Sequence, residues 1–364
     1  MRPVRRTILL LACCVASWTA SSCLPAGEHG SALGDEHADL APDGGAPADA
    51  PTDDDPPDDD DDAGPRTDDE PPDAGAPEQG VTCTGDHTVS GCAPDGEGDL
   101  RCSLAHGGRT REYLLHVPPM LEGPMPVVFA FHGLRTTAGL QRWISNMNDA
   151  ADAHGYVVVY PEGIGTSALD QSFNAGLCCG VAQASAVDDV GFTLAILEVL
   201  RAPLCVDARR VFATGLSNGG HMAYRLACER ADVFAAIAPV AGLVTVASCT
   251  PARPVAVLHF HGTEDRIVGY STGIDGITGA VDTVERWAER DGCASTPAAV
   301  HENGEASCVA YPDCQGGASV ELCTIEGGGH TWPGGEELTV LGHTTQDLDA
   351  TERISQFFAA HPMP

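Results

Sequence analysis

The sequence predicts an α/β domain in which a mainly parallel sheet carries helices on both faces, and three observations lead to this fold class. Short apolar runs that end in glycine recur along the chain, as is typical of buried parallel strands. Stretches with helical periodicity separate these runs, so strand and helix alternate. A serine between glycines, in Gly215-Leu216-Ser217-Asn218-Gly219, stands where one strand gives way to a helix. In such sheets the working residues gather at the carboxyl ends of the strands.

The predicted strands are short and apolar. The first, REYLLHVP at residues 111–118, alternates like an edge strand. Buried parallel strands are predicted at 125–133 (MPVVFAFHG), 155–163 (GYVVVYPEG), 209–215 (RRVFATG) and 253–262 (RPVAVLHFHG). The last strand is expected in SVELCTIEGGGH, at 319–330, with SCVAYPDC at 307–314 beside it.

Helices are predicted between these strands. From Asp188 to Leu200, apolar residues recur near one face after an acidic start that suits a helix N-terminus. Residues 282–290 and 352–359 have a helical pattern as well, and a further helix follows Ser217. Asp188 and Asp189, at the start of the helix predicted at 188–200, are expected to be a helix cap or a buried polar anchor.

The 364 residues carry a large excess of negative charge. The formal net charge is −33, with 52 acidic residues against 19 basic ones, all of them arginine. Phosphate binding needs clustered basic residues, so this balance argues against nucleic acid as a partner.

The first 23 residues have the layout of a secretory signal peptide, with arginines, an apolar centre and then small residues. The apolar centre is too short to span a membrane. Ala20-Ser21-Ser22-Cys23 resembles a bacterial lipobox, which predicts that Cys23 is lipidated and anchors the protein to a membrane. Plain secretion with cleavage nearby is the alternative.

Residues 24–80 are dominated by Asp, Pro, Ala and Gly and have almost nothing to bury, so we expect a disordered acidic linker. Proline and like charges extend such a chain. It suits a tether that holds a domain away from a membrane, while a simple solvated spacer is favoured over a calcium-binding role. The folded domain is therefore predicted at 81–364, with a short cysteine-bearing segment at 83–102 in front.

This domain contains an even number of cysteines, and in an exported protein that predicts disulfides. Zinc is the rival, but neither a CxxC…CxxC nor an HExxH pattern occurs. If 307–314 and 319–330 are neighbouring strands, Cys308 faces Cys323, which leaves Cys293 and Cys314 as partners. Cys178 and Cys179 are expected to bond to other cysteines, because a ring between neighbours strains the peptide bond.

Ser217 is the predicted nucleophile. A G-x-S-x-G turn between strand and helix is a nucleophile elbow, which holds the serine in a strained conformation at the rim of the sheet. The helix beyond supplies free N–H groups and the positive end of a dipole. A simple turn residue is the alternative at Ser217, and the flanking strand and helix argue against it.

A neutral serine needs a base, and the base needs an orienting acid. In this arrangement the acid and then the histidine follow the serine along the chain. The segment HGTEDRIVGY offers Asp265, with Glu264 beside it, after a buried strand, and GGGH places His330 after the last strand. Either residue could instead be an ordinary surface group. His259 and His261 come too early and are expected to be structural.

An oxyanion hole needs two backbone N–H groups aimed at the developing charge. One is expected from Asn218, and the other from Leu134 in the loop after FAFHG. His132 is expected to support this loop beside the substrate pocket. Trp332 either lines that pocket or packs inside.

The segments GLSNGGHMAYRLA, HGTEDRIVGY and GGGHTWPGG, with FHG upstream and CCG…VDDVGF between, resemble a family of exported serine esterases. It includes feruloyl esterases of the B/C/D type and poly(3-hydroxybutyrate) depolymerases, the LpqC-like group. The resemblance covers about residues 100–360. It implies an α/β-hydrolase fold with Ser217 as nucleophile, Asp265 as acid and His330 as base. The loop after HG reads LRTT, where relatives often have a small residue.

Three functions are weighed. The first is a carboxylic ester hydrolase without metal or organic cofactor, acting outside the cell on feruloyl or acetyl esters of xylan or, second, on polyhydroxyalkanoate. The second is a peptidase, although peptidases of this fold carry a large gating domain. The third is a non-catalytic surface lipoprotein that binds a glycan or partner, and the full Ser, Asp and His set argues against it.

Overall fold

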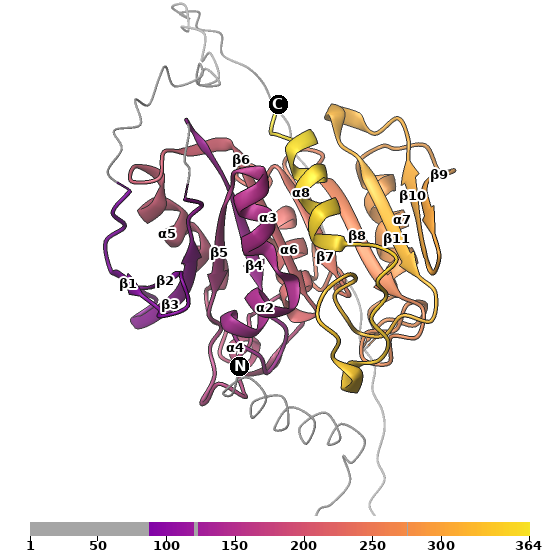
Figure 1. Cartoon of the computed structure of the whole chain (residues 1–364). Coiled ribbons are helices and arrows are strands. Elements are labelled where there is room, and N and C mark those ends of the chain that lie inside the picture. Colours follow the sequence, from indigo (N-terminus) through magenta and orange to yellow (C-terminus); the bar gives the residue numbers. More distant parts are fainter. Residues whose placement is uncertain (1–86, 120–122, 275) are drawn as a thin grey trace, which may run out of the picture. The chain divides into compact units, whose positions relative to one another are not determined.

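The computed structural model describes residues 87–119, 123–274 and 276–364 (Figure 1). The expectations for residues 1–23 and 24–80, including lipidation at Cys23, lie outside these residues. An 11-stranded sheet runs through the described part in the order β1-β2-β3-β5-β4-β6-β7-β8-β11-β10-β9. Its strands are β1 (Cys92–Pro94), β2 (Leu100–His106), β3 (Arg109–His116), β4 (Met125–Phe131), β5 (Val157–Pro161), β6 (Val206–Leu216), β7 (Ala236–Val240), β8 (Ala256–Gly262), β9 (Ala298–Asn303), β10 (Ala306–Tyr311) and β11 (Val320–Ile325).

The middle of the sheet is parallel, which confirms the predicted fold class. β5, β4, β6, β7, β8 and β11 are joined by parallel pairings. Antiparallel strands extend both edges: β3, β2 and β1 beyond β5, and β10 and β9 beyond β11. A parallel centre brings the carboxyl ends of its strands to one rim, where the predicted site residues follow β4, β6, β8 and β11.

The strand predicted at the edge is in fact third from the edge. Residues 111–118 correspond to β3, which pairs with β2 on one side and with β5 on the other. β2 escaped prediction because it is largely exposed and has little apolar patterning, and it pairs in turn with β1. The cysteine-bearing segment thus adds two strands to this edge.

The helices cover both faces of the sheet (Figure 1). α5 (Asp189–Arg201), α6 (Asn218–Glu229) and α7 (Ala280–Arg290) contribute to one apolar core, and α2 (Ala138–Ser145), α3 (Met147–His154) and α8 (Ala350–Ala360) contribute to the other. A short α4 (Gly180–Ala184) lies between β5 and α5. Strands buried on both sides read as continuous apolar runs: in β4, Val127 and Phe129 face the first core and Val128 the second.

Disulfides join five pairs of described cysteines: Cys92–Cys102, Cys178–Cys179, Cys228–Cys249, Cys293–Cys314 and Cys308–Cys323. The last two pairs confirm the sequence prediction, since Cys308 and Cys323 are directly opposite in the β10–β11 register.

The expectation for Cys178 and Cys179 is wrong, because they bond to each other. Their Cα atoms are 3.1 Å apart across a cis peptide bond, within reach of a shared disulfide. Disulfides are typical of oxidising, extracellular compartments. Among the described residues, no helix combines the length and apolar character that a membrane span requires.

Candidate active site

Ser217 occupies a sharp turn between β6 and α6. Its backbone angles are φ 59° and ψ −119°, in a region that residues with a side chain rarely adopt. The Ser217 N–H donates to the carbonyl oxygen of Val240, at the end of the adjacent strand β7, at 2.9 Å. A Cβ atom at Gly219 would overlap the carbonyl oxygen of Phe131 in β4. The glycine after the serine is therefore required for α6 to start this close to the sheet.

Asp265 and His330 lie together at the same rim, although 65 positions separate them. Asp265 follows β8 and His330 follows β11, and these strands are parallel neighbours. The two side chains meet at 2.7 Å between Oδ2 of Asp265 and Nδ1 of His330, and both residues are buried. Glu264, the other acid in this loop, is exposed.

The surroundings of Asp265 favour its charged form. Burial raises the pKa of this carboxyl, but the charge of His330 and hydrogen bonds from His261 and His330 outweigh burial and lower the pKa below its usual value. Oδ1 also accepts from the N–H groups of Ile267 at 2.9 Å and Val268 at 2.8 Å. A carboxylate only accepts, so Nδ1 of His330 carries a proton in this contact, and when the ring is neutral its Nε2 has a free lone pair.

Ser217 stands at the end of β6, two strands away from β8 in the sheet. His221, one helical turn after Ser217, lies near enough to His330 and Asp265 for their charges to act on its pKa, although burial is the main reason why the pKa of His221 falls to about 4. No hydrogen bond joins Ser217 to His330 in the part of the chain that the structure describes. In enzymes without substrate this contact is often long and closes in the complex.

The loop after β4 packs directly on the serine. A Cβ atom at Gly133 would lie 3.5 Å from Cβ of Ser217, and half-buried Leu134 follows. His132 is fully buried beneath this loop, where Nδ1 donates to the Gly133 carbonyl oxygen at 2.7 Å and Nε2 accepts from the Gly163 N–H at 2.9 Å. Because burial lowers the pKa of His132 to about 4, the ring is neutral, and Glu162 at 3.6 Å forms no ion pair with it.

The side chain of Asn218 forms hydrogen bonds to the loop around Phe173, for which the sequence predicted no role. Its Oδ1 accepts from the Phe173 N–H at 2.7 Å, and its Nδ2 donates to the Phe173 carbonyl oxygen at 3.0 Å. The Asn218 backbone N–H is at the first position of α6, where no carbonyl of the helix can accept from it.

The sequence predicted that Trp332 either lines the substrate pocket or packs inside the domain. The residue is 2% exposed. Its Nε1 donates to Oγ1 of Thr351 in α8 at 2.9 Å. Its indole packs in the core on the α8 side of the sheet. A role for Trp332 toward substrate stays a prediction.

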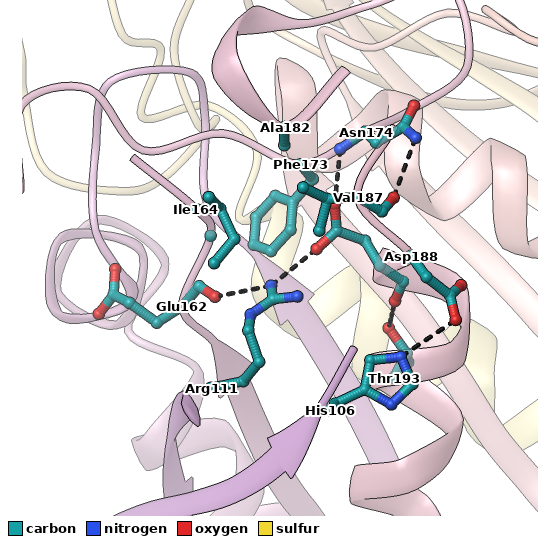
Figure 2. A network of polar contacts seen from close by, with 12 residues as sticks. His106, Arg111, Glu162, Ile164, Phe173, Asn174, Ala182, Val187, Asp188 and Thr193 are labelled. Carbon is teal, nitrogen blue, oxygen red and sulfur yellow. Dashed lines mark hydrogen bonds and ion pairs between the residues drawn. The ribbon is translucent and has the colours of Figure 1, made fainter. Parts of the chain in front are cut away.

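A buried ion pair holds the Phe173 loop to the sheet, as Figure 2 shows. Arg111 of β3 donates through Nη2 to Oδ1 of Asp189 at 2.7 Å and to the carbonyl oxygen of Glu162 at 3.2 Å. The other carboxylate oxygen of Asp189 accepts from the Asn174 N–H at 2.7 Å. Asp188 caps α5 by accepting from the Gly191 N–H at 2.8 Å. The expectation that these two acids are a cap and a buried anchor is confirmed.

We expect Arg111→Met to lower the free energy of unfolding by about 3–5 kcal/mol, because it leaves the buried Asp189 carboxylate without its counter-charge. Chemical denaturation would measure the change. The matched control is Arg101→Met in β2, whose partner Glu112 is 3.4 Å away with both side chains about half exposed, and we expect it to cost at most about 1 kcal/mol. Equal losses in the two variants would contradict this interpretation of the network.

One group of described residues combines metal-ligating side chains, namely Cys178, Cys179 and His221, whose ligand atoms lie within 4.8 Å of one another. Metal binding uses thiolates, and both sulfurs are already in a disulfide. The donor set therefore does not fit a metal ion in this oxidation state.

The sequence of this chain is similar to those of known proteins. The family model described as the prolyl oligopeptidase family matches residues 145–250, which include the elbow. Feruloyl esterase B of Piromyces equi is 34% identical over 218 residues, which are 56% of this chain and 39% of that protein. The match thus spans well under half of the length of this relative.

A second relative is matched over most of its length. The putative esterase NocK of Nocardia uniformis subsp. tsuyamanensis is 31% identical over 284 residues, or 69% of this chain and 79% of that protein. The solved acetyl xylan esterase from Aspergillus awamori superposes with a TM-score of 0.50 at 17% identity, over 69% of this chain and 94% of the other. This structural likeness supports the fold, a mixed but mostly parallel α/β-hydrolase sheet. The chain thus belongs to the esterase family that contains the feruloyl esterases B, C and D.

Proposed function

We propose that the protein is an exported serine esterase that cleaves feruloyl or acetyl esters of a plant polysaccharide such as xylan. Ser217 is the nucleophile, His330 the general base and Asp265 the orienting acid. The observation that carries the proposal is the buried contact between Asp265 and His330 at the rim where the Ser217 elbow also stands. The names of the relatives, feruloyl esterase and acetyl xylan esterase, supply the substrate class.

In this mechanism each group has one task. His330, held by Asp265 with its proton on Nδ1, accepts the Ser217 proton at Nε2 while Oγ attacks the ester carbonyl. The backbone N–H groups of Asn218 and Leu134 stabilise the developing oxyanion. His330 returns the proton to the departing alcohol, leaving an acyl-enzyme. Water, activated by the same ring, then releases the acid and regenerates Ser217.

A substrate panel tests the reaction class and the substrate together. We expect acid to be released from methyl ferulate and from acetylated xylan, and a fluorophosphonate probe to label Ser217. Release from poly(3-hydroxybutyrate) granules alone would assign the protein to polyester degradation instead. Cleavage of a chromogenic proline peptide without any ester cleavage would favour a peptidase, the class named by the matching family model. Failure of the probe to label the protein would favour a non-catalytic binder.

We further propose that the acidic segment 24–80 is a tether and that Cys23 carries the lipid that attaches it to a membrane. In a bacterial host fed a clickable fatty acid, we expect the full chain to be labelled and to sediment with membranes. Cys23→Ser is expected to abolish both label and sedimentation, while Cys14→Ser, within the same leader, leaves both unchanged. An unlabelled wild-type protein in the culture medium would instead support plain secretion.

A further inference from the structure

Behind the Asp265–His330 pair, three buried side chains form a hydrogen-bonded row that the mechanism above does not use. The hydroxyl of Tyr224 in α6 lies 2.9 Å from Nδ1 of His259 in β8. Nε2 of His259 lies 3.0 Å from Nδ1 of His261, two residues further along the same strand. Nε2 of His261 lies 2.7 Å from the carbonyl oxygen of Val268. All three side chains are buried in the structure.

The direction of this row follows from which atoms are able to donate. The Val268 carbonyl only accepts, so Nε2 of His261 carries a proton. If His261 is neutral, its Nδ1 accepts from His259, and Nδ1 of His259 accepts from the Tyr224 hydroxyl. Every donor then has an acceptor.

The reverse direction is less favourable. It would need a charged His261 and would leave the buried Tyr224 hydroxyl without an acceptor among the described residues, at a cost of about 1–3 kcal/mol. His259 itself is neutral, because burial holds its pKa well below the usual value. The row therefore runs from Tyr224 toward Val268.

The end of the row meets the carboxylate that holds His330. Nε2 of His261 lies 3.4 Å from Oδ2 of Asp265, the same oxygen that accepts from His330. The other oxygen, Oδ1, accepts from the Val268 N–H at 2.8 Å. His261 thus contacts both the carboxylate and, through the Val268 carbonyl, the loop that orients it.

We infer that His261, held in one tautomer by His259 and Tyr224, is a positioning residue for ester hydrolysis that fixes the Asp265 carboxylate against His330. Without this row, Asp265 could rotate or its loop could shift, and His330 would lose its orientation toward Ser217. The inference rests on the proposed roles of Asp265 and His330. It adds three residues that act through Asp265 and do not touch the substrate.

Two substitutions at position 261, in the full chain, separate positioning from simple packing. His261→Leu removes both polar atoms, and His261→Gln keeps an N–H group for Val268 and an oxygen that accepts from His259. We expect His261→Leu to lower kcat by about 10- to 100-fold with little change in KM, since a misplacement of about 1 Å costs up to about 100-fold. His261→Gln is expected to recover most of that loss. Rates are divided by the active sites titrated with a fluorophosphonate.

A spectroscopic measurement follows the same contact directly. The proton between Nδ1 of His330 and Asp265 is expected to give a low-field NMR resonance in the wild type and in His261→Gln. In His261→Leu this resonance is expected to shift or to broaden. A His261→Leu protein that is less stable but retains the wild-type kcat and resonance would overturn the inference, because its role would then be packing alone.

Tyr224→Phe tests the far end of the row if His261→Leu does not fold. We expect a several-fold loss of kcat, because His259 loses the donor that fixes its tautomer. The matched control is Tyr113→Phe in β3, which removes a buried hydroxyl that has no hydrogen-bond partner in the described structure, and kcat is expected to stay unchanged. An unchanged kcat in Tyr224→Phe would overturn the inference. If Asp265→Asn were fully active, another group would orient His330, and the proposed role of Asp265, on which this inference rests, would be wrong.

Discussion

Ser217→Ala is expected to lower kcat for p-nitrophenyl acetate by about a million-fold, the loss typical of removing the nucleophile of such a triad. Oγ forms the bond to the acyl carbon, and no neighbouring side chain in the proposed mechanism replaces it. Stability is expected to change little, because no described hydrogen bond involves the hydroxyl. Initial rates and a thermal melt would measure both effects.

Ser185→Ala is the matched control for this prediction. Ser185 is exposed at the end of α4 and has no part in the mechanism. Its loss is expected to leave both the rate and the melting temperature as in the wild type. If Ser217→Ala and Ser185→Ala were equally active, the elbow serine would not be the nucleophile, and the proposed mechanism would be wrong.

Asp265→Asn is expected to lower kcat by about ten-thousandfold, because an amide in this place can hold His330 in the wrong tautomer. With the amide NH₂ group donating to Nδ1, the ring proton would move to Nε2, and the ring could no longer accept the Ser217 proton. Steady-state kinetics would measure the loss. Retained activity would mean that another group orients His330.

The same substitution has a second expected effect, on acid stability. The pKa of Asp265 is lower in the folded protein than its usual value, so its ionised form stabilises the fold above about pH 3.9, the reference pKa of an unfolded Asp. This contribution is lost as the pH falls through the lower, folded-state pKa. Asp265→Asn has no such group, so its stability is expected to depend less on pH in this acidic range.

Residues that are close in the sequence carried most of the correct predictions. The elbow depends on a strand, a serine between glycines and a helix, all within one short segment, and β6 and α6 meet there as expected. The buried strands were predictable because a strand covered on both faces has a continuous apolar run. Two strands were missed for different reasons: β2 is mostly exposed and has no such run, whereas β7 is a short apolar run that contains Pro239, a residue that argues against a central strand.

The sequence supplied the candidate site residues but not the contacts that support them. Chain order selected Asp265 and His330 as candidates, and they follow strands that are neighbours in the sheet. The buried contacts around them join positions far apart: Asn218 with Phe173, Arg111 with Asp189, and Tyr224 with His259. No periodicity in the sequence marks such pairs.

The amino-acid order alone was therefore enough for the fold class and for a serine in a strained turn, because turn chemistry and apolar patterning act over a few residues. It also supplied the candidates for acid and base, whose roles stay predictions. The order of the strands, the disulfide between adjacent cysteines and the polar row behind Asp265 became apparent only once the sheet was assembled. Burial explains the difference: a polar group that leaves water must find its partner in space, wherever along the chain that partner lies.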